Sequence, residues 1–208
     1  MKMRSITAVI ALSAFASMGI AVAHADSRSA LADAQPSALV PLLAESRSTN
    51  QPVPELIDLE DTEILSSSVR YVGDSDLGKH WVGSDNESNI CVITEMTDDL
   101  GAANVGGIAC TPREDFFQRG LTLRLEEGGG EGVVSHLLPS DAKAPELEQS
   151  GTAANSRHSG EDIEVIEQSD TTLLVLSTDS ADQRGSIEVQ RSTELGELKL
   201  SPLTGSLR

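Results

Sequence analysis

Cys91 and Cys110 are the residues with the clearest chemical potential, because they are the only two cysteines among 208 residues. Two thiols can act as a redox switch, supply half of a metal site, or close a disulfide. A structural zinc site needs four ligands, usually cysteine or histidine, and the scattered histidines do not obviously complete one. The chain also lacks the C-x-x-C of a thioredoxin-type redox pair. We therefore predict a structural disulfide between Cys91 and Cys110.

The triplet Gly73-Asp74-Ser75 matches the motif that carries the serine nucleophile in the GDS-type esterases and lipases. A serine hydrolase also needs a histidine base and an orienting acid, and that family's base belongs to an Asp-x-x-His near the C-terminus. The last histidine here is His158, and no aspartate stands three residues before it. We therefore predict no catalytic residue and interpret residues 73–78 as a hairpin turn. The alternative is a small secreted hydrolase, in which His80 or His136 would share a cleft with a serine and a carboxylate.

Four carboxylates are candidates for holding a hard cation such as calcium, because they lie in two neighbouring turns of the predicted fold. They lack the spacing and the glycine of an EF-hand loop, so we predict no metal site and no cofactor. An acidic cation-binding protein remains an alternative function. The four residues are Asp74, Asp76, Asp85 and Glu87.

His80 and Trp81 are the candidates for a binding site. A histidine close to carboxylates can act as a base or a metal ligand, although an exposed histidine on a strand needs neither role. Sugar-binding modules use exposed aromatic side chains, so Trp81 is a sugar-binding candidate only if it is exposed. We expect instead that Tyr71 and Trp81 pair across two adjoining strands in the core.

The N-terminal sequence predicts export. Lys2 and Arg4 precede an uncharged run over 6–23, and Ala23-His24-Ala25 fits a signal-peptidase site. We predict a signal peptide at 1–25, cleaved before Asp26, and a protein that is secreted or associated with the cell envelope. The alternative is an uncleaved membrane anchor, because the apolar run approaches the length that spans a bilayer. An oxidising destination agrees with the predicted disulfide.

The charge of the chain restricts its partners. Removal of residues 1–25 removes two basic residues and no acidic one, which lowers the formal charge from −18 to −20. Such a charge keeps a protein soluble and repels nucleic acid and anionic lipid. We therefore predict no nucleic-acid partner and no membrane span after cleavage. The charge would favour a basic extracellular or envelope partner.

Composition divides the chain into one domain and its flanks. Residues 26–62 contain four prolines, and we predict a flexible linker in which 39–43 form a short docking turn of helix. Residues 140–162 have almost no large apolar side chain and predict a mobile loop. Between and beyond these segments we predict a single β-rich domain over 63–203, followed by a tail at 204–208.

Short alternating and apolar runs predict a mainly β (α+β) fold with an antiparallel sheet. Pairing 90–96 with 105–110 so that the two cysteines are opposite also places Ile93 opposite Ile108 and Met96 opposite Val105. The disulfide then clamps the open end of a hairpin and adds about 3 kcal/mol to stability. The predicted strands are 67–72, 79–82, 90–96, 105–110, 121–125, 133–138, 163–166, 172–177, 187–189 and 198–203.

One short helix is predicted over about 112–119. Thr111 and Glu114 have the spacing of a capping box, Pro112 suits a first helical position, and Gly120 suits the end. Phe116 and Phe117 supply its apolar cover.

Several segments resemble a group of uncharacterised exported proteins of actinobacteria: SSSVRYVG, a cysteine-bearing strand, IACTPREDFFQRGLTL and SHLLPS. The resemblance covers about 56–139 and, more faintly, 163–203. It implies an extracytoplasmic domain behind an N-terminal signal or anchor, and it brings no catalytic residues. We therefore expect a non-catalytic module that acts through binding or structure.

Overall fold

The structure is a computed structural model, and it describes residues 34–97, 102–127, 132–144, 156–160, 163–192 and 196–201. The predicted signal peptide and C-terminal tail lie outside these ranges, as does most of the predicted loop at 140–162. The fold is mainly β with antiparallel pairing, as the sequence predicted. The first sheet has four strands in chain order: β1 (Arg70–Ser75), β2 (Gly78–Ser84), β3 (Ile90–Thr97) and β4 (Ala103–Thr111).

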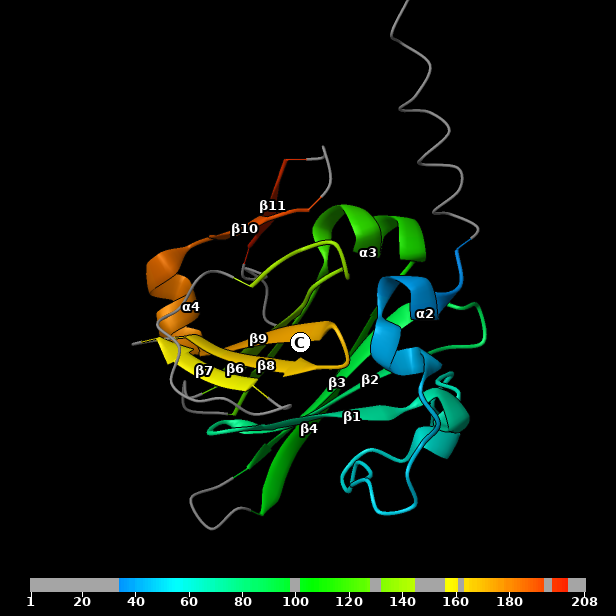
Figure 1. The fold of residues 1–208 in the computed structure, drawn as a ribbon. Helices are drawn as coiled ribbons and strands as arrows, with labels where there is room; N and C mark the ends of the chain where they lie inside the picture. Colours follow the sequence, from blue (N-terminus) through cyan, green and yellow to red (C-terminus); the bar gives the residue numbers. More distant parts are fainter. Residues whose placement is uncertain are drawn as a thin grey trace, which may run out of the picture.

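A second sheet has five strands and faces the first (Figure 1). Its strands follow the order β5 (Leu121–Glu126), β6 (Gly132–Leu137), β9 (Thr171–Ser177), β8 (Ile163–Gln168) and β7 (Ser156–Gly160). A two-stranded hairpin is formed by β10 (Ile187–Gln190) and β11 (Glu197–Leu200).

Strand β7 corrects part of the mobile loop predicted at 140–162. Residues 156–160 pair antiparallel with β8, and Gly160 is opposite Ile163. The sequence SRHSG has no apolar pattern that would predict a strand. The segment lies at the edge of the sheet, where backbone hydrogen bonds alone can hold it.

Apolar clusters separate four layers. The main cluster lies between the two sheets and includes Val82 and Val92 from the first and Leu173 and Val175 from the second. A second cluster lies on the far face of the five-stranded sheet, under β10, β11 and a short helix. A third covers the outer face of the four-stranded sheet and includes Trp81 and Ile93. Both faces of both sheets are therefore covered, at least in part.

Glycines allow the two sheets to approach at their edges. A β-carbon on Gly107 of β4 would lie 2.2 Å from Cδ2 of Leu125 on β5. A β-carbon on Gly73 of β1 would lie 2.7 Å from Cγ2 of Ile166 on β8. Because both distances are far below van der Waals contact, a larger residue at either position would force the facing side chain to shift.

The predicted register of the β3–β4 hairpin is confirmed. Cys91 is opposite Cys110, Ile93 is opposite Ile108, and Met96 is opposite Val105. The cysteines form a disulfide with their Cα atoms 4.1 Å apart. The hairpin is therefore clamped near its open end.

Two seven-residue helices connect strands, of which the sequence predicted one. Helix α3 (Arg113–Arg119) matches the predicted position, and Gly120 ends it with a φ of 67°. The capping box is wrong, because Thr111 is the last residue of β4 and Pro112 occupies the cap without a side-chain hydrogen bond. Helix α4 (Thr178–Arg184) was not predicted. Its signal was local, since the Ser177 side chain accepts a hydrogen bond from the Ser180 N–H.

The linker predicted over 26–62 is corrected by its packing. Helix α2 (Pro36–Leu39) and the 3₁₀ turn η1 (Pro41–Ala44) place Leu39, Val40 and Leu42 in the main core, and the Leu42 N–H donates to Thr171 Oγ1 at 3.0 Å. Two of the four prolines that suggested breaks, Pro36 and Pro41, instead stand at the first positions of these turns, where proline is well tolerated. The docking turn predicted at 39–43 is part of this arrangement.

Residues 51–65, which we call the strap, cross the outer face of the four-stranded sheet. They include the 3₁₀ turn η2 (Leu59–Asp61), and the turn η3 (Ser66–Ser68) follows. Ile57, Leu59 and Ile64 of the strap pack on the cluster that contains Trp81 and Ile93. The end of the strap is fixed to the β2–β3 turn, because the Leu65 N–H donates to the Ser84 carbonyl at 2.9 Å.

Candidate functional site

Ser75 and His80 form the pair of side chains that most resembles a catalytic site. Ser75 ends β1 and His80 lies on β2, and a two-residue turn brings Ser75 Oγ to 2.8 Å from His80 Nε2. The His80 side chain is fully buried between the two sheets. This burial lowers the pKa of His80 to about 3, so the imidazole is neutral near pH 7.

Hydroxyl groups occupy the other side of the His80 ring. Its Nδ1 lies 3.1 Å from Thr94 Oγ1 of β3 and 3.4 Å from Ser135 Oγ of β6. Thr94 Oγ1 and Ser135 Oγ are themselves 3.1 Å apart, so the cluster joins both sheets. A hydrolase histidine would be oriented at this nitrogen by a carboxylate, and hydroxyls take its place here.

The hydrogen-bond directions also run against a nucleophilic serine. Ser75 Oγ donates to the Gly78 carbonyl at 3.2 Å and accepts from the Leu77 N–H at 3.1 Å. With the Ser75 proton directed to Gly78, we assign the ring proton of His80 to Nε2, which donates to Ser75. Nδ1 then accepts from the Thr94 hydroxyl. In this tautomer His80 cannot take a proton from Ser75, and each polar atom of the pair has a partner.

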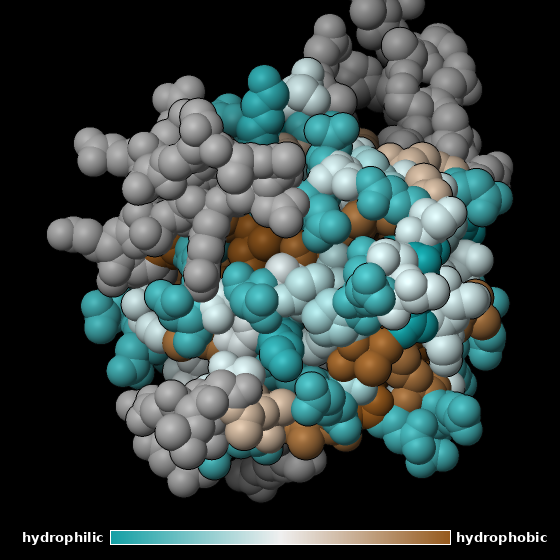
Figure 2. Space-filling view, turned by 60° about the horizontal axis from the view of Figure 1, so that its bottom comes forward, coloured by the Kyte–Doolittle hydropathy of each residue, from teal (hydrophilic) through white to brown (hydrophobic). Residues whose placement is uncertain are grey.

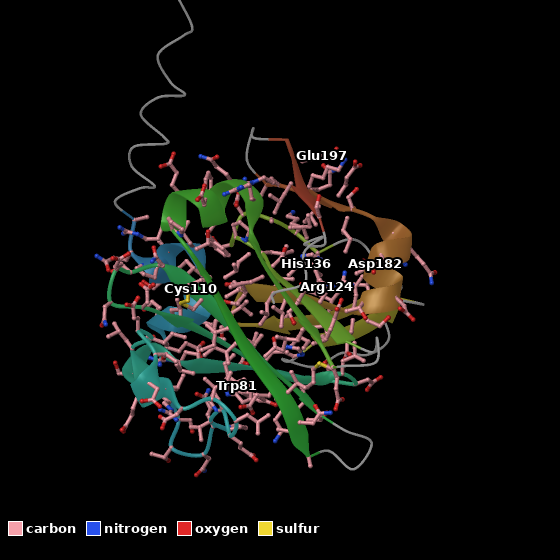
Figure 3. All side chains as sticks on the ribbon, turned by 180° about the vertical axis from the view of Figure 1, so that it is seen from behind. Trp81, Cys110, Arg124, His136, Asp182 and Glu197 are labelled. Atoms are coloured by element: carbon pink, nitrogen blue, oxygen red, sulfur yellow. A yellow bond between two sulfur atoms is a disulfide. The ribbon has the colours of Figure 1, made fainter. Side chains whose placement is uncertain are left out.

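His136 does not join this cluster. It follows Ser135 on β6, so its side chain leaves the opposite face of the sheet. Its Nδ1 lies 2.8 Å from Thr122 Oγ1, and burial lowers the pKa of His136 to about 4. The cleft that would have favoured a hydrolase is therefore not formed by His80 and His136 together. His136 also lies well apart from the binding candidate Trp81, because the two residues belong to different sheets (Figure 3).

The carboxylate candidates for a cation separate into two groups. Asp74 near the end of β1 and Asp76 in the β1–β2 turn lie at one end of β2, whereas Asp85 and Glu87 belong to the β2–β3 turn at the other end. The seven residues of β2 lie between these turns, a span of about 20 Å at the usual rise of a strand. No single cation can therefore bind both pairs.

Asp85 has a structural task in its turn. Its carboxylate accepts hydrogen bonds from the backbone N–H of Glu87 at 2.9 Å and of Asn89 at 2.8 Å, and from the Asn89 side chain at 2.8 Å. It also lies within 4.8 Å of the sulfurs of Cys91 and Cys110, but those atoms are bonded to each other and are not thiolate ligands.

Trp81 is fully buried, so it offers no exposed platform for a sugar ring. Its ring centroid lies 5.7 Å from that of Tyr71, and the two residues are directly opposite on β1 and β2, as the sequence predicted. The indole Nε1–H donates to the Pro52 carbonyl of the strap at 3.0 Å. Trp81 therefore anchors the strap.

Glu95 is a site residue that sequence reasoning missed. It lies on the strap side of β3 and is fully buried, with Oε1 accepting the Leu56 N–H at 2.7 Å. Its Oε2 has no hydrogen-bond partner among the residues that the structure describes. Gln51 Oε1, at the start of the strap, is also buried without a hydrogen-bond partner in the described ranges. Unpaired buried acceptors are costly, and within the described ranges both belong to this one interface.

The outer surface of the strap combines exposed apolar and acidic side chains. Val53, Leu56 and Leu65 keep 46%, 47% and 41% of their surface exposed, and in the described part of the chain they are the exposed large hydrophobic residues. All acidic residues of the strap are exposed as well, namely Glu55, Asp58, Glu60, Asp61 and Glu63. In the sequence, apolar residues are interspersed among the acids over 55–64, and they are the signal that could have indicated packing of this segment.

Comparisons with protein-family models, curated proteins and solved structures found no match to this chain. In the part of the chain that the structure describes, no helix has the length and apolar character needed to cross a membrane.

Proposed function

We propose that this protein is a non-catalytic module that acts by binding, outside the cytoplasm or in the cell envelope. The observation that carries the proposal is the environment of the Ser75–His80 pair. The pair is buried in the interior, and hydroxyl groups lie at both ring nitrogens of His80, with Thr94 rather than a carboxylate at Nδ1. Such a cluster joins two sheets and leaves no reactive group accessible to a substrate.

The disulfide supports a location outside the cytoplasm. A bond between Cys91 and Cys110 indicates an oxidising environment during folding. Together with the signal-peptide pattern of residues 1–25, this favours secretion or attachment to the envelope. The resemblance to uncharacterised exported proteins of actinobacteria is part of the same proposal.

Labelling with a fluorophosphonate tests the absence of a nucleophilic serine. The reagent reacts with activated serines, and a known serine hydrolase in the same tube serves as the positive control. We expect no labelling of the folded protein, because Ser75 and His80 are buried and hydroxyls rather than a carboxylate contact His80 Nδ1. Labelling that is lost in Ser75→Ala would show a hydrolase instead.

Two measurements test the binding and location. Oxidised protein that lacks residues 1–25 should capture a specific partner from an envelope extract, in competition with free protein. Protein recovered from the medium of the producing cell should begin at Asp26. Full-length chain that stays with membranes after a high-salt wash would indicate an anchor.

A further inference from the structure

The strap has the features of a docking surface. It carries three exposed apolar side chains and five exposed carboxylates, and no lysine, arginine or histidine occurs between residues 48 and 69. Figure 2 looks onto the bottom of the molecule, where this segment lies in Figure 1, and shows hydrophobic patches bordered by hydrophilic residues. Apolar side chains gathered on one segment are a common mark of an interaction site.

The buried side of the strap points to the same place. Glu95 uses one carboxylate oxygen to hold the Leu56 N–H, and the other oxygen is buried without a partner among the described residues. Lys79 is directly opposite Glu95 on the neighbouring strand, but its Nζ contacts Glu55 of the strap at 3.5 Å. An acceptor therefore stays open directly beneath the exposed Leu56, and a hydrogen-bond donor inserted beside Leu56 would satisfy it.

We propose that the strap binds a basic, amphipathic peptide segment of a partner protein. Apolar side chains of that segment would pack on Val53, Leu56 and Leu65, and its lysine or arginine side chains would face the exposed carboxylates of the strap. The buried Oε2 of Glu95 would accept a hydrogen bond from a donor that enters beside Leu56. The inference rests on the proposed binding function and names its surface and partner class.

Charge selects this occupant over the others. A second copy of the chain would place five carboxylates against five carboxylates in a symmetric contact, which like-charge repulsion opposes. An anionic membrane surface or nucleic acid would be repelled in the same way. A cationic segment gains both the electrostatic and the apolar part of the surface.

The test uses a dye-labelled peptide of alternating lysine and leucine, and fluorescence anisotropy with the oxidised protein that lacks residues 1–25. Two control peptides replace every lysine by glutamate or every leucine by serine. We expect the lysine–leucine peptide to bind, and both controls to bind at least about tenfold more weakly.

Matched protein variants locate the contact. Leu56→Ser removes an exposed apolar anchor and should weaken binding about tenfold. Glu60→Gln in the strap and Glu188→Gln on β10 remove the same charge from exposed positions, so general attraction to an acidic protein responds equally to both. We expect Glu60→Gln to weaken binding about threefold and Glu188→Gln to leave it unchanged.

Two results would overturn the strap as the docking surface: no binding of the lysine–leucine peptide, or binding that Leu56→Ser leaves intact while the two glutamate variants behave alike. Either result would leave the wider proposal standing if the protein still captures a specific envelope partner. If the lysine–leucine peptide binds at the strap but the protein captures no specific partner from an envelope extract, the result would count against the proposed binding function.

Discussion

The interior cluster around His80 and the interface beneath the strap are two buried polar regions on opposite faces of the same sheet. In the interior, the hydroxyls of Ser75, Thr94 and Ser135 surround His80 and satisfy its ring nitrogens. Beneath the strap, Glu95 keeps one carboxylate oxygen without a partner among the described residues. The interior region contains a serine and a histidine, as a hydrolase site does, but their hydrogen bonds are satisfied by neighbouring residues, as is usual in a protein core.

This difference shows that residue types alone do not define a site. A buried polar group with all its partners holds a structure together, whereas one without a partner marks a place where a further group fits. The strap also carries the exposed apolar side chains, so the incomplete bonding lies beneath the accessible surface. We therefore place the interaction surface on the strap and assign the Ser75–His80 pair to stability.

The largest expected effect is acid destabilisation by the two buried histidines. Burial lowers the pKa of His80 to about 3 and of His136 to about 4, against 6.5 for an unperturbed histidine. Their neutral forms therefore stabilise the folded state fully above pH 6.5, and this contribution is lost as the pH falls toward 4. We expect a loss of about 2 kcal/mol per histidine by pH 5, measured by urea unfolding from pH 7.5 to 5.

His136→Gln provides the control for this pH dependence. It removes one titrating group outside the His80 cluster and should reduce the slope by about half. A free energy of unfolding that does not change between pH 7.5 and 5 would mean that the two histidines bind protons equally in the folded and unfolded states, which would contradict a closed interior.

The disulfide should have the next largest effect. Replacing both Cys91 and Cys110 by alanine should lower the free energy of unfolding by about 2–4 kcal/mol, because the unfolded chain regains the entropy of the closed loop. Reduction of the parent protein should give a similar loss, and its urea transition provides the comparison. Two thiols that react with a labelling reagent in native, unreduced protein would contradict the bond itself.

Thr94→Val tests whether the interior cluster is a structural unit. The substitution keeps the shape of the side chain but removes the hydroxyl that contacts both His80 and Ser135. We expect a loss of about 1–2 kcal/mol in the free energy of unfolding. Thr97→Val, at a half-exposed position on the same strand, is the control and should change it by less than about 0.5 kcal/mol. Equal effects of the two variants would show that the cluster contributes nothing special.

The smallest effect is expected on the strap surface. Leu56→Ser should change the free energy of unfolding by less than about 0.5 kcal/mol, because the side chain is already 47% exposed. Ile57→Ser, at the next position, should cost about 1–2 kcal/mol, since Ile57 packs on the third cluster. If Leu56→Ser costs as much as Ile57→Ser, Leu56 is a core residue and not a surface available to a partner.

Much of the four-stranded sheet could be predicted because its signals are local and mutually consistent. One register of the β3–β4 hairpin pairs the cysteines and the apolar side chains together, and the Tyr71–Trp81 pair follows from the adjoining hairpin. The segments 36–44 and 51–65 could not be predicted in the same way. Their prolines and acids resemble those of a linker, and their burial depends on two sheets assembled from residues far along the chain.

The candidate site was only partly accessible to sequence reasoning. His80 and Ser75 were identified as chemically interesting, but their burial depends on the second sheet, which is distant in sequence and contributes Ser135 to the cluster. Glu95 lies on the same face of β3 as Ile93, and this outer face has no cover until the strap is placed. Nothing in its local sequence distinguishes it from an exposed glutamate.

The most direct measurement is an amide NMR titration of isotope-labelled, oxidised protein with the lysine–leucine peptide. We predict that the shifts concentrate in residues 51–65 and at Glu95, and that the Trp81 indole N–H moves because its acceptor is the Pro52 carbonyl of the strap. Signals of Ser75, Thr94 and Ser135 should stay in place. Shifts centred on those three residues, with the strap unaffected, would contradict the assignment of binding to the strap and return the interior pair to consideration as the functional site.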